Sequence, residues 1–285
     1  MPDRGARPGA VQPPDQPAAV HDAGDNRGVS STEPAMRRLW PVADPGPLSD
    51  EDIVAAYPAP AGQRLLRVNF VSSVDGAVTL DGRSGPLGGP GDRRILGLLR
   101  VNCDAVLVAA GTVRVEGYSP LRTAEARRRL RIERGRTPDP VLVLVTRRLG
   151  FDPADPRFTQ APQRPVVLTT EETAQRVGNR FADVADVIGV GHEDVDLGAG
   201  LDALAERGLV HVLCEGGPHL FGSLIAADLV DELCLTLAPK LVGPGPERIV
   251  AGPDTAVRTL ALTQILAAGD ELFLRYTRTR PSSSD

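Results

Sequence analysis

Cysteine, aromatic side chains and long apolar runs are all scarce in this chain. Its 285 residues include only 3 cysteines, 1 tryptophan, 3 tyrosines and 6 phenylalanines. Cys103, Cys214 and Cys234 lie far apart, so we expect buried free thiols rather than a metal site. No apolar run approaches the roughly 18 residues that cross a bilayer, and the N-terminus lacks the apolar core of a signal peptide. These absences predict a cytoplasmic protein that does not act on membranes.

Several catalytic signatures are absent as well. The chain has no Gly-x-Ser-x-Gly nucleophile elbow and no Gly-Lys-Ser/Thr phosphate loop. Its four histidines, His21, His192, His211 and His219, show no metal-ligand spacing, so we expect no metal. A net charge of −5 argues weakly against nucleic acid as the main partner. With serine hydrolase, phosphate-loop, metal and nucleic-acid sites set aside, we expect a protein that binds small molecules.

The chain divides into one large unit with short flanking segments. Residues 1–35 are rich in Pro, Gly, Asp and Ala, so a disordered tail is expected. Residues 36–62 contain a helix start at residues 48–52 and are predicted to form a strap or lid. Residues 63–280 are predicted to be a single domain, and residues 281–285 a second short tail.

The domain alternates between short apolar runs and helical patterns, which predicts a largely parallel sheet covered on both faces. Residues 229–240 and 272–279 alternate apolar and polar side chains instead, which predicts two antiparallel strands at one edge. The Pro/Gly-rich residues 239–253 would join them. The runs interpreted as parallel strands are residues 65–71, 105–110, 141–145, 164–169, 186–190 and 209–214.

Three local patterns give further expectations. Val78 and Leu80, which precede an Asp-Gly pair, are predicted to form a short second strand. Asp92 is predicted to cap a helix that ends near Arg100. The arginine-rich residues 124–136, including Arg131, are interpreted as the solvated face of a helix rather than an anion site.

Four glycine-bearing loops are predicted at strand ends: residues 72–76, 84–91, 111–117 and 215–217. In an α/β sheet such ends line one crevice, where a nucleotide cofactor binds. Residues 209–226 are central, because a buried strand is followed by Gly216 and Gly217 and then by a helix that Pro218 opens. That turn is interpreted either as a phosphate site at a helix N-terminus or as an ordinary tight turn. The adjoining Glu215 favours the first interpretation.

An ordered set of motifs runs through the domain. The set comprises Val-Asn-Phe-Val-Ser-Ser-Val-Asp-Gly at residues 68–76, Ala-Ala-Gly-Thr-Val at 109–113 and Cys-Glu-Gly-Gly-Pro at 214–218. Leu-Val-Asp-Glu-Leu at 229–233 and Ala-Pro-Lys at 238–240 follow. In this order the motifs resemble the pyrimidine reductase family of riboflavin biosynthesis, and the resemblance covers about residues 64–278. It implies a dihydrofolate reductase-like fold, a three-layer α/β/α arrangement with a mostly parallel central sheet and an antiparallel C-terminal edge.

This resemblance also implies an activity. Members of the family reduce a ribosylaminopyrimidine phosphate, of the 5-amino-6-(5-phosphoribosylamino)uracil type, by hydride transfer from NADPH to the ribose C1. The deaminase domain that often accompanies them needs His-x-Glu and Pro-Cys-x-x-Cys zinc ligands, which are absent here. A stand-alone reductase is therefore expected, and the resemblance also implies a homodimer.

Residue roles follow from the same resemblance. Asp75 and Glu215 would be catalytic and face the substrate. Asn69, Ser84, Arg100 and Arg122 would bind the substrate, the last three by clasping its phosphate. NADPH would be held by Ser72, Gly111, Thr112, Glu116, Gly216, Gly217, Pro218, His219, Leu220 and Phe221.

A preference for NADPH over NADH is expected from the residues that follow the strand at 141–145. Thr146, Arg147 and Arg148 stand where a cation would meet the 2′-phosphate of NADPH. The alternative interpretation, an exposed basic turn, is equally well supported by the sequence.

Two departures from the family pattern leave open which substrate the protein binds and how its phosphate is held. Glu116-Gly117-Tyr118 replaces Asp followed by Asp-Pro, and Pro86-Leu87-Gly88-Gly89 replaces a Trp-Ile-Thr run. A pterin or dihydrofolate reductase and a nucleotide-binding protein without turnover remain alternative interpretations.

Overall fold

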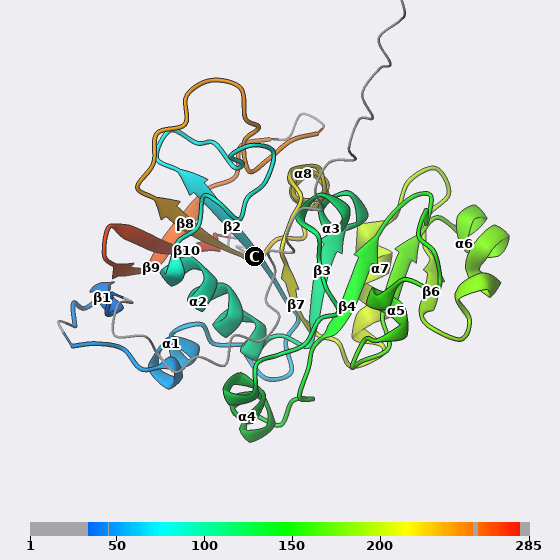
Figure 1. Ribbon diagram of the computed structural model, residues 1–285, viewed down its shortest axis with the longest axis horizontal. Helices are drawn as coiled ribbons and strands as arrows, with labels where there is room; N and C mark the ends of the chain where they lie inside the picture. The colour runs from blue at the N-terminus through cyan, green and yellow to red at the C-terminus, as the bar shows by residue number, and fades with distance from the viewer. Residues whose placement is uncertain (1–33, 45, 253–255, 280–285) are drawn as a thin grey trace, which may run out of the picture.

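A ten-stranded sheet runs through the whole molecule, with helices on both of its faces (Figure 1). The computed structural model describes residues 34–44, 46–252 and 256–279. The strands are β1 (Arg37–Trp40), β2 (Leu65–Ser73), β3 (Ala105–Ala109), β4 (Val141–Val145), β5 (Val166–Thr169), β6 (Asp186–Gly189), β7 (His211–Cys214), β8 (Glu232–Ala238), β9 (Leu260–Ala268) and β10 (Glu271–Arg278). The helices are α1 (Asp50–Ala56), α2 (Pro90–Leu99), α3 (Ala110–Glu116), α4 (Glu125–Glu133), α5 (Pro156–Thr159), α6 (Glu171–Val177), α7 (Leu197–Ala205) and α8 (Pro218–Ala226), with short 3₁₀ turns η1 (Arg100–Asn102) and η2 (Gly178–Phe181).

The strand order is β1-β9-β10-β8-β2-β7-β3-β4-β5-β6. From β8 to β6 every neighbouring pair is parallel, whereas β1, β9, β10 and β8 pair antiparallel. The carboxyl ends of the parallel strands therefore share one edge of the sheet. The predicted fold class, mostly parallel with an antiparallel C-terminal edge, is confirmed.

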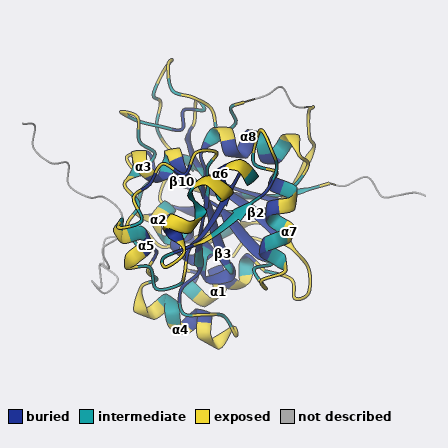
Figure 2. Ribbon diagram, turned by 90° about the vertical axis from the view of Figure 1, so that its right-hand side faces the viewer, coloured by how far each residue is buried: buried dark blue, intermediate teal, exposed yellow. Residues whose placement is uncertain are grey.

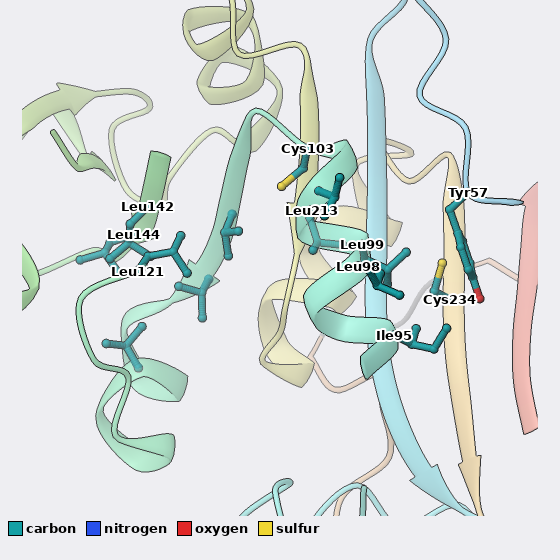
Figure 3. Packing of buried hydrophobic residues seen from close by; sticks show 14 of the residues in the cluster. Tyr57, Ile95, Leu98, Leu99, Cys103, Leu121, Leu142, Leu144, Leu213 and Cys234 are labelled. Carbon is teal, nitrogen blue, oxygen red and sulfur yellow. The ribbon is translucent and has the colours of Figure 1, made fainter. Parts of the chain in front are cut away.

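Two hydrophobic cores fill the space between the sheet and its helices. On one face Ile95, Leu98 and Leu99 of α2 pack against Leu213 and Cys234 (Figure 3). On the other face, α7 and α8 bury apolar side chains against β2, β7 and β3. Figure 2 shows the dark-blue buried strands enclosed by helices whose outer surfaces are exposed. Covering on both faces accounts for the near-continuous apolar strands of the sequence.

The antiparallel edge contains two strands that the sequence analysis did not predict. β8 and β10 pair directly, with Leu235 opposite Leu274, as expected. The structure adds β9, which the sequence analysis missed, as the hairpin partner of β10 through a turn at Gly269 and Asp270. β1, also unpredicted, extends the edge beyond β9.

Several local predictions are wrong, because tertiary contacts override short patterns. Val78 and Leu80 form no strand, and Leu80 makes only an isolated bridge to Arg83. The predicted loop after β3 is helix α3, whose Val113 is fully buried and which Gly117 ends in a left-handed conformation at φ +70. Asp92 lies inside α2, whose N-cap is Gly89.

The arginine-rich helix α4 is also more than a solvated face. Arg131 is completely buried, and its guanidinium donates to the carbonyl oxygens of Cys103 and Thr137, each at 2.8 Å. It also bonds the carbonyl oxygen of Arg100. Arg131 therefore anchors the segment that connects α2 to β3.

The predicted strap packs as part of the domain. Ser49 caps α1 in a capping box with Asp52, as the sequence pattern indicates. Ile53 and Tyr57 are buried in the core beside α2. Residues 1–33 of the predicted N-terminal tail and the whole predicted C-terminal tail, residues 281–285, lie outside the described residues. None of the helices described between residues 34 and 279 has the length and apolar character needed to span a bilayer.

Candidate active site

The residues singled out from the sequence gather at the carboxyl edge of the parallel strands. Ser72 is the penultimate residue of β2, Gly111 lies in the helix after β3, Thr146 follows β4, and Glu215 follows β7. Adjacent parallel pairing of β2, β7, β3 and β4 places these segments next to one another. Such an edge is where open α/β sheets bind ligands.

Glu215 is buried and fully engaged. Its side chain is 2% exposed, and Arg100 binds both carboxylate oxygens, Nε to Oε1 at 2.6 Å and Nη2 to Oε2 at 2.7 Å. Tyr118 donates its hydroxyl to Oε2 at 2.9 Å. Burial lowers the pKa of Arg100, but the Glu215 carboxylate outweighs it and raises the pKa above its ordinary value. Two of the five N–H donors of Arg100 are thus taken by Glu215, and any phosphate contact would use those that remain.

Tyr118 is a site residue that the sequence analysis noted only as a departure from the family pattern. Burial and the neighbouring Glu215 raise its pKa well above the ordinary value, so the phenol stays protonated and donates to the carboxylate. The aromatic residue that replaces a family proline therefore holds Glu215 in place.

The turn after β7 brings two backbones close together. A Cβ on Gly217 would lie 2.5 Å from Thr112 Oγ1, so only glycine allows this approach. Gly216 has φ +105 and its peptide bond to Gly217 is cis. Among the described residues no side chain caps α8 at Gly217 or α3 at Ala109. The opening amides of α8 therefore suit an anionic group.

Not every residue predicted for the cofactor faces this turn through its side chain. Leu220 and Phe221 are buried in the core, and Phe221 stacks on Phe70 with ring centroids 5.2 Å apart. Any contact between these two residues and a cofactor would therefore come from their backbone. His219 is exposed beside Gly252. Ser72 is buried and donates to the carbonyl oxygen of Ser73 at 2.9 Å.

Asp75 anchors the turn that follows β2. Its carboxylate accepts hydrogen bonds from the Ser73 hydroxyl and from the amides of Val242 and Gly243. These donors, with Ser73 the strongest, hold the pKa of Asp75 below its ordinary value. The exposed carboxylate is therefore an anion throughout the neutral range, and it joins the turns after β2 and β8.

The structure brings two other predicted residues together. Glu116 Oε1 accepts the amide of Ser84 at 2.8 Å, which fixes the start of the loop at residues 84–91. Lys240, which follows β8, fixes the middle of that loop by donating to the carbonyl oxygens of Pro86 at 2.6 Å and Leu87 at 2.7 Å. The Lys240 contact had no local signal, because the two segments are over 150 residues apart.

The end of β4 opens onto a hollow of about 700 Å³. Arg147 and Arg148 line it, as do Arg176 and His192, which sequence reasoning did not include. Arg147 pairs with Asp194 at 3.1 Å, and both side chains are mostly exposed. The hollow therefore carries exposed cationic side chains of the kind that binds a phosphate.

The remaining predicted substrate residues occupy different surroundings. Asn69 is 9% exposed on β2, and its Oδ1 has no hydrogen-bond partner among the described residues. Arg122 is exposed and donates to the carbonyl oxygen of Gln160 at 2.8 Å. Arg122 is thus engaged with the end of α5, whereas Ser84 is engaged with α3.

Comparisons with known proteins agree on one family. Residues 64–274 match the model of the family described as the RibD C-terminal domain. The 2,5-diamino-6-ribosylamino-4(3H)-pyrimidinone 5′-phosphate reductases of Archaeoglobus fulgidus and Methanothermobacter thermautotrophicus are 28% and 29% identical to the chain. The alignments cover 71% and 74% of this chain and 93% and 96% of those proteins. A pyrimidine reductase-like protein from Corynebacterium diphtheriae superposes with a TM-score of 0.70 at 27% identity, over 82% of this chain and all of that one.

Proposed function

The chain belongs to the RibD C-terminal domain family, and from this membership we propose that it reduces a ribosylaminopyrimidine phosphate with NADPH. The observation that carries the proposal is the uncapped start of α8, packed through Gly217 against Thr112 of α3. The end of β4, with its arginines, lies on the other side of β3 from β7. Relatives named as 2,5-diamino-6-ribosylamino-4(3H)-pyrimidinone 5′-phosphate reductases support the same reaction type.

On this proposal the cofactor lies along the ends of β7, β3 and β4. The opening amides of α8, with Gly111 and Thr112 of α3, would hold the pyrophosphate. Arg147 would meet the 2′-phosphate in the hollow beyond β4. The residues fit such a group, since a Cβ at Gly111 meets no described atom within 4 Å and the backbone can be approached closely. NADPH, when bound, supplies the hydride.

The two predicted catalytic carboxylates take different roles. Asp75, an anion with a lowered pKa, would stabilise positive charge that develops at the ribose C1 as the sugar opens. A proton donor at neutral pH needs a raised pKa, so Asp75 is assigned to charge stabilisation. Glu215, neutralised by Arg100, would set the position of Gly216 and Gly217 beside the cofactor.

We assign the substrate to the opposite side of β2, under the loop at residues 84–91. Asn69 and Ser84 lie on this side, and Lys240 and Glu116 hold the loop in place. Arg122 remains a candidate for the phosphate, and it would have to leave Gln160 to reach it.

A second molecule of this chain is proposed to cover the antiparallel edge. Leu260, Leu262 and Leu272 are 37%, 38% and 36% exposed on β9 and β10. Exposed apolar side chains on one face of paired strands are suited to packing against another protein surface. We also propose a cytoplasmic location, because the three cysteines are free thiols, as in a reducing compartment.

One assay tests the proposal against its alternatives. The full chain is mixed with NADPH and either the ribosylaminopyrimidine phosphate or dihydrofolate, and loss of the nicotinamide absorbance is followed. Turnover of the first substrate supports the proposal. Turnover of dihydrofolate alone would make the chain a pterin reductase. Binding of NADPH without turnover of either would make it a nucleotide-binding protein.

A further inference from the structure

Lys240 is the only lysine among the 32 lysine and arginine residues of the chain. It is half-buried, and its ammonium donates to two successive carbonyl oxygens, those of Pro86 at 2.6 Å and Leu87 at 2.7 Å. One nitrogen with three N–H donors can serve two adjacent oxygens in this manner, whereas the donors of a guanidinium are spread over a planar fork. The single lysine is therefore matched to the loop that it binds.

The segment that Lys240 binds is a closed turn at residues 84–87. The amide of Leu87 donates to the carbonyl oxygen of Ser84 at 2.9 Å, and the Ser84 amide donates to Glu116 Oε1 at 2.8 Å. The Leu87 side chain is 1% exposed and packs against the ends of β2 and β8. These contacts engage the backbone of Ser84 and leave its hydroxyl for a ligand.

The backbone that begins at Lys240 also binds the turn that carries Asp75. The carbonyl oxygen of Lys240 accepts the amide of Val74 at 3.0 Å. The Asp75 carboxylate accepts the amides of residues 242 and 243, at 3.1 and 2.7 Å. One short segment therefore joins the turn at residues 84–87 to the turn of Asp75.

A buried carboxylate beside the loop accounts for a cation at this position. Asp92 of α2 packs directly against the loop, since a Cβ on Gly88 would lie 2.1 Å from its Oδ2. Burial raises the pKa of Asp92 to about 6, and the Lys240 ammonium is one of the groups that oppose the rise. Asp92 therefore supplies a nearby negative charge for an ammonium whose hydrogen bonds go to neutral carbonyl oxygens.

We infer that Lys240 is a positioning residue, which fixes the distance between the Ser84 turn and Asp75. This inference rests on the proposed function, with Ser84 at the substrate phosphate and Asp75 at the ribose C1. In the substrate the phosphate and C1 belong to one sugar, so its bonds limit the spacing between them. The protein groups that serve them must match this spacing, because a misplacement of about 1 Å can lower the rate roughly 10²-fold.

The phosphate dependence of turnover tests this role. The ratio kcat/KM is measured for the ribosylaminopyrimidine phosphate and for the same compound without its phosphate, in the unaltered chain and in Lys240→Met. Methionine keeps an unbranched side chain but has no N–H donor. Lys240→Met should lower kcat/KM for the phosphorylated substrate roughly tenfold or more, the scale of losing hydrogen bonds from a charged donor. The value for the dephosphorylated compound, and NADPH affinity in calorimetry, should stay unchanged.

Arg164→Met is the matched control. It removes a cation that likewise donates to backbone carbonyl oxygens, those of Asp183 and Ala185, each at 3.0 Å. These contacts precede β5 and β6 at the far end of the sheet, so kcat/KM should stay unchanged for both compounds. An equal loss for both compounds in Lys240→Met would overturn the inference, because a general loss of structure does not depend on the phosphate.

The unaltered chain provides a second test, which does not depend on whether a variant folds. With lysine labelled at 13Cε, Lys240 gives the only lysine side-chain signal in an NMR spectrum. Ribose 5-phosphate should shift this signal and ribose should not, because the phosphate contacts the turn that the ammonium holds. The same response to both sugars would overturn the inference.

These measurements separate the inference from the proposed function. Turnover by the unaltered chain that is equally fast in Lys240→Met would keep the reductase assignment and reject the role of Lys240. Absence of turnover in the unaltered chain, with a lysine signal that responds to ribose 5-phosphate alone, would reject the reductase assignment and support Lys240 as a residue that positions a sugar phosphate.

Discussion

Arg100 and Glu215 form a bidentate ion pair that ties the end of α2 to the turn after β7. The two contacts are 2.6 and 2.7 Å, and the side chains are 19% and 2% exposed. Tyr118 completes the arrangement from the segment after α3. Arg100, Tyr118 and Glu215 together therefore link the end of α2, the segment after α3 and the turn after β7. Glu215 directly precedes Gly216 and Gly217 in that turn.

Removing the Glu215 charge should destabilise the fold. Glu215→Gln leaves the Arg100 guanidinium buried without its counter-charge, and breaking such pairs costs about 3–5 kcal/mol. The free energy of unfolding is measured by urea titration. Arg64→Ala, which loses an exposed pair with Asp202, should cost no more than about 1 kcal/mol. Full stability of Glu215→Gln with abolished turnover would instead assign Glu215 directly to the chemistry.

Gly217→Val should weaken NADPH binding by roughly tenfold or more while circular dichroism shows a folded chain. The added side chain meets Thr112 Oγ1 and moves the start of α8 away from its position beside α3. Gly150→Ala is the control, because a Cβ there meets no described atom within 4 Å. Normal affinity of Gly217→Val in calorimetry would mean that the turn serves structure alone.

Asp75→Asn should lower turnover by roughly 10²-fold with the true substrate and leave NADPH affinity unchanged. The amide oxygen can still accept from Val242 or Gly243, so the turn should persist. Because the pKa of Asp75 is lowered, its contribution should be constant at neutral pH and be lost only when the pH falls below the ordinary aspartate range. A variant that turns over normally would show that Asp75 acts only as a turn residue.

Arg147→Ala combined with Arg148→Ala should reduce the preference for NADPH over NADH by roughly tenfold or more, since hydrogen bonds between charged groups are lost. Arg176→Ala, which removes another arginine that lines the hollow, should reduce it further. Arg164→Ala, which loses contacts near Asp186 away from this hollow, is the matched control. Equal binding of both nucleotides by the unaltered chain would defeat the prediction.

Light scattering should give the mass of a dimer at micromolar concentration. Leu262→Glu with Leu272→Glu places charges on the open face of β9 and β10 and should yield single chains without loss of secondary structure. A single-chain mass for the unaltered protein would reject the dimer.

Short-range patterns were enough to predict much of the fold. Strand 211–214, the glycine turn and the helix opened by Pro218 follow from apolar run length and helix-start chemistry, which act within a few residues. Strand–helix alternation likewise predicted the parallel sheet, because both faces must be covered. The order of the motifs along the chain indicated the family, which the match to residues 64–274 confirms.

The partners of individual side chains were decided by the tertiary structure. Arg100 and Glu215 are 115 residues apart, so no local pattern could pair them. Asp92 has the position of a helix cap in the sequence, but packing of α2 turns it toward Thr236, and Gly89 takes the cap. The sequence by itself determined most of the parallel strands, the helix that Pro218 opens and the family, since these depend on neighbouring residues. Which strands pair at the antiparallel edge, and which charges are neutralised, depended on how distant segments meet.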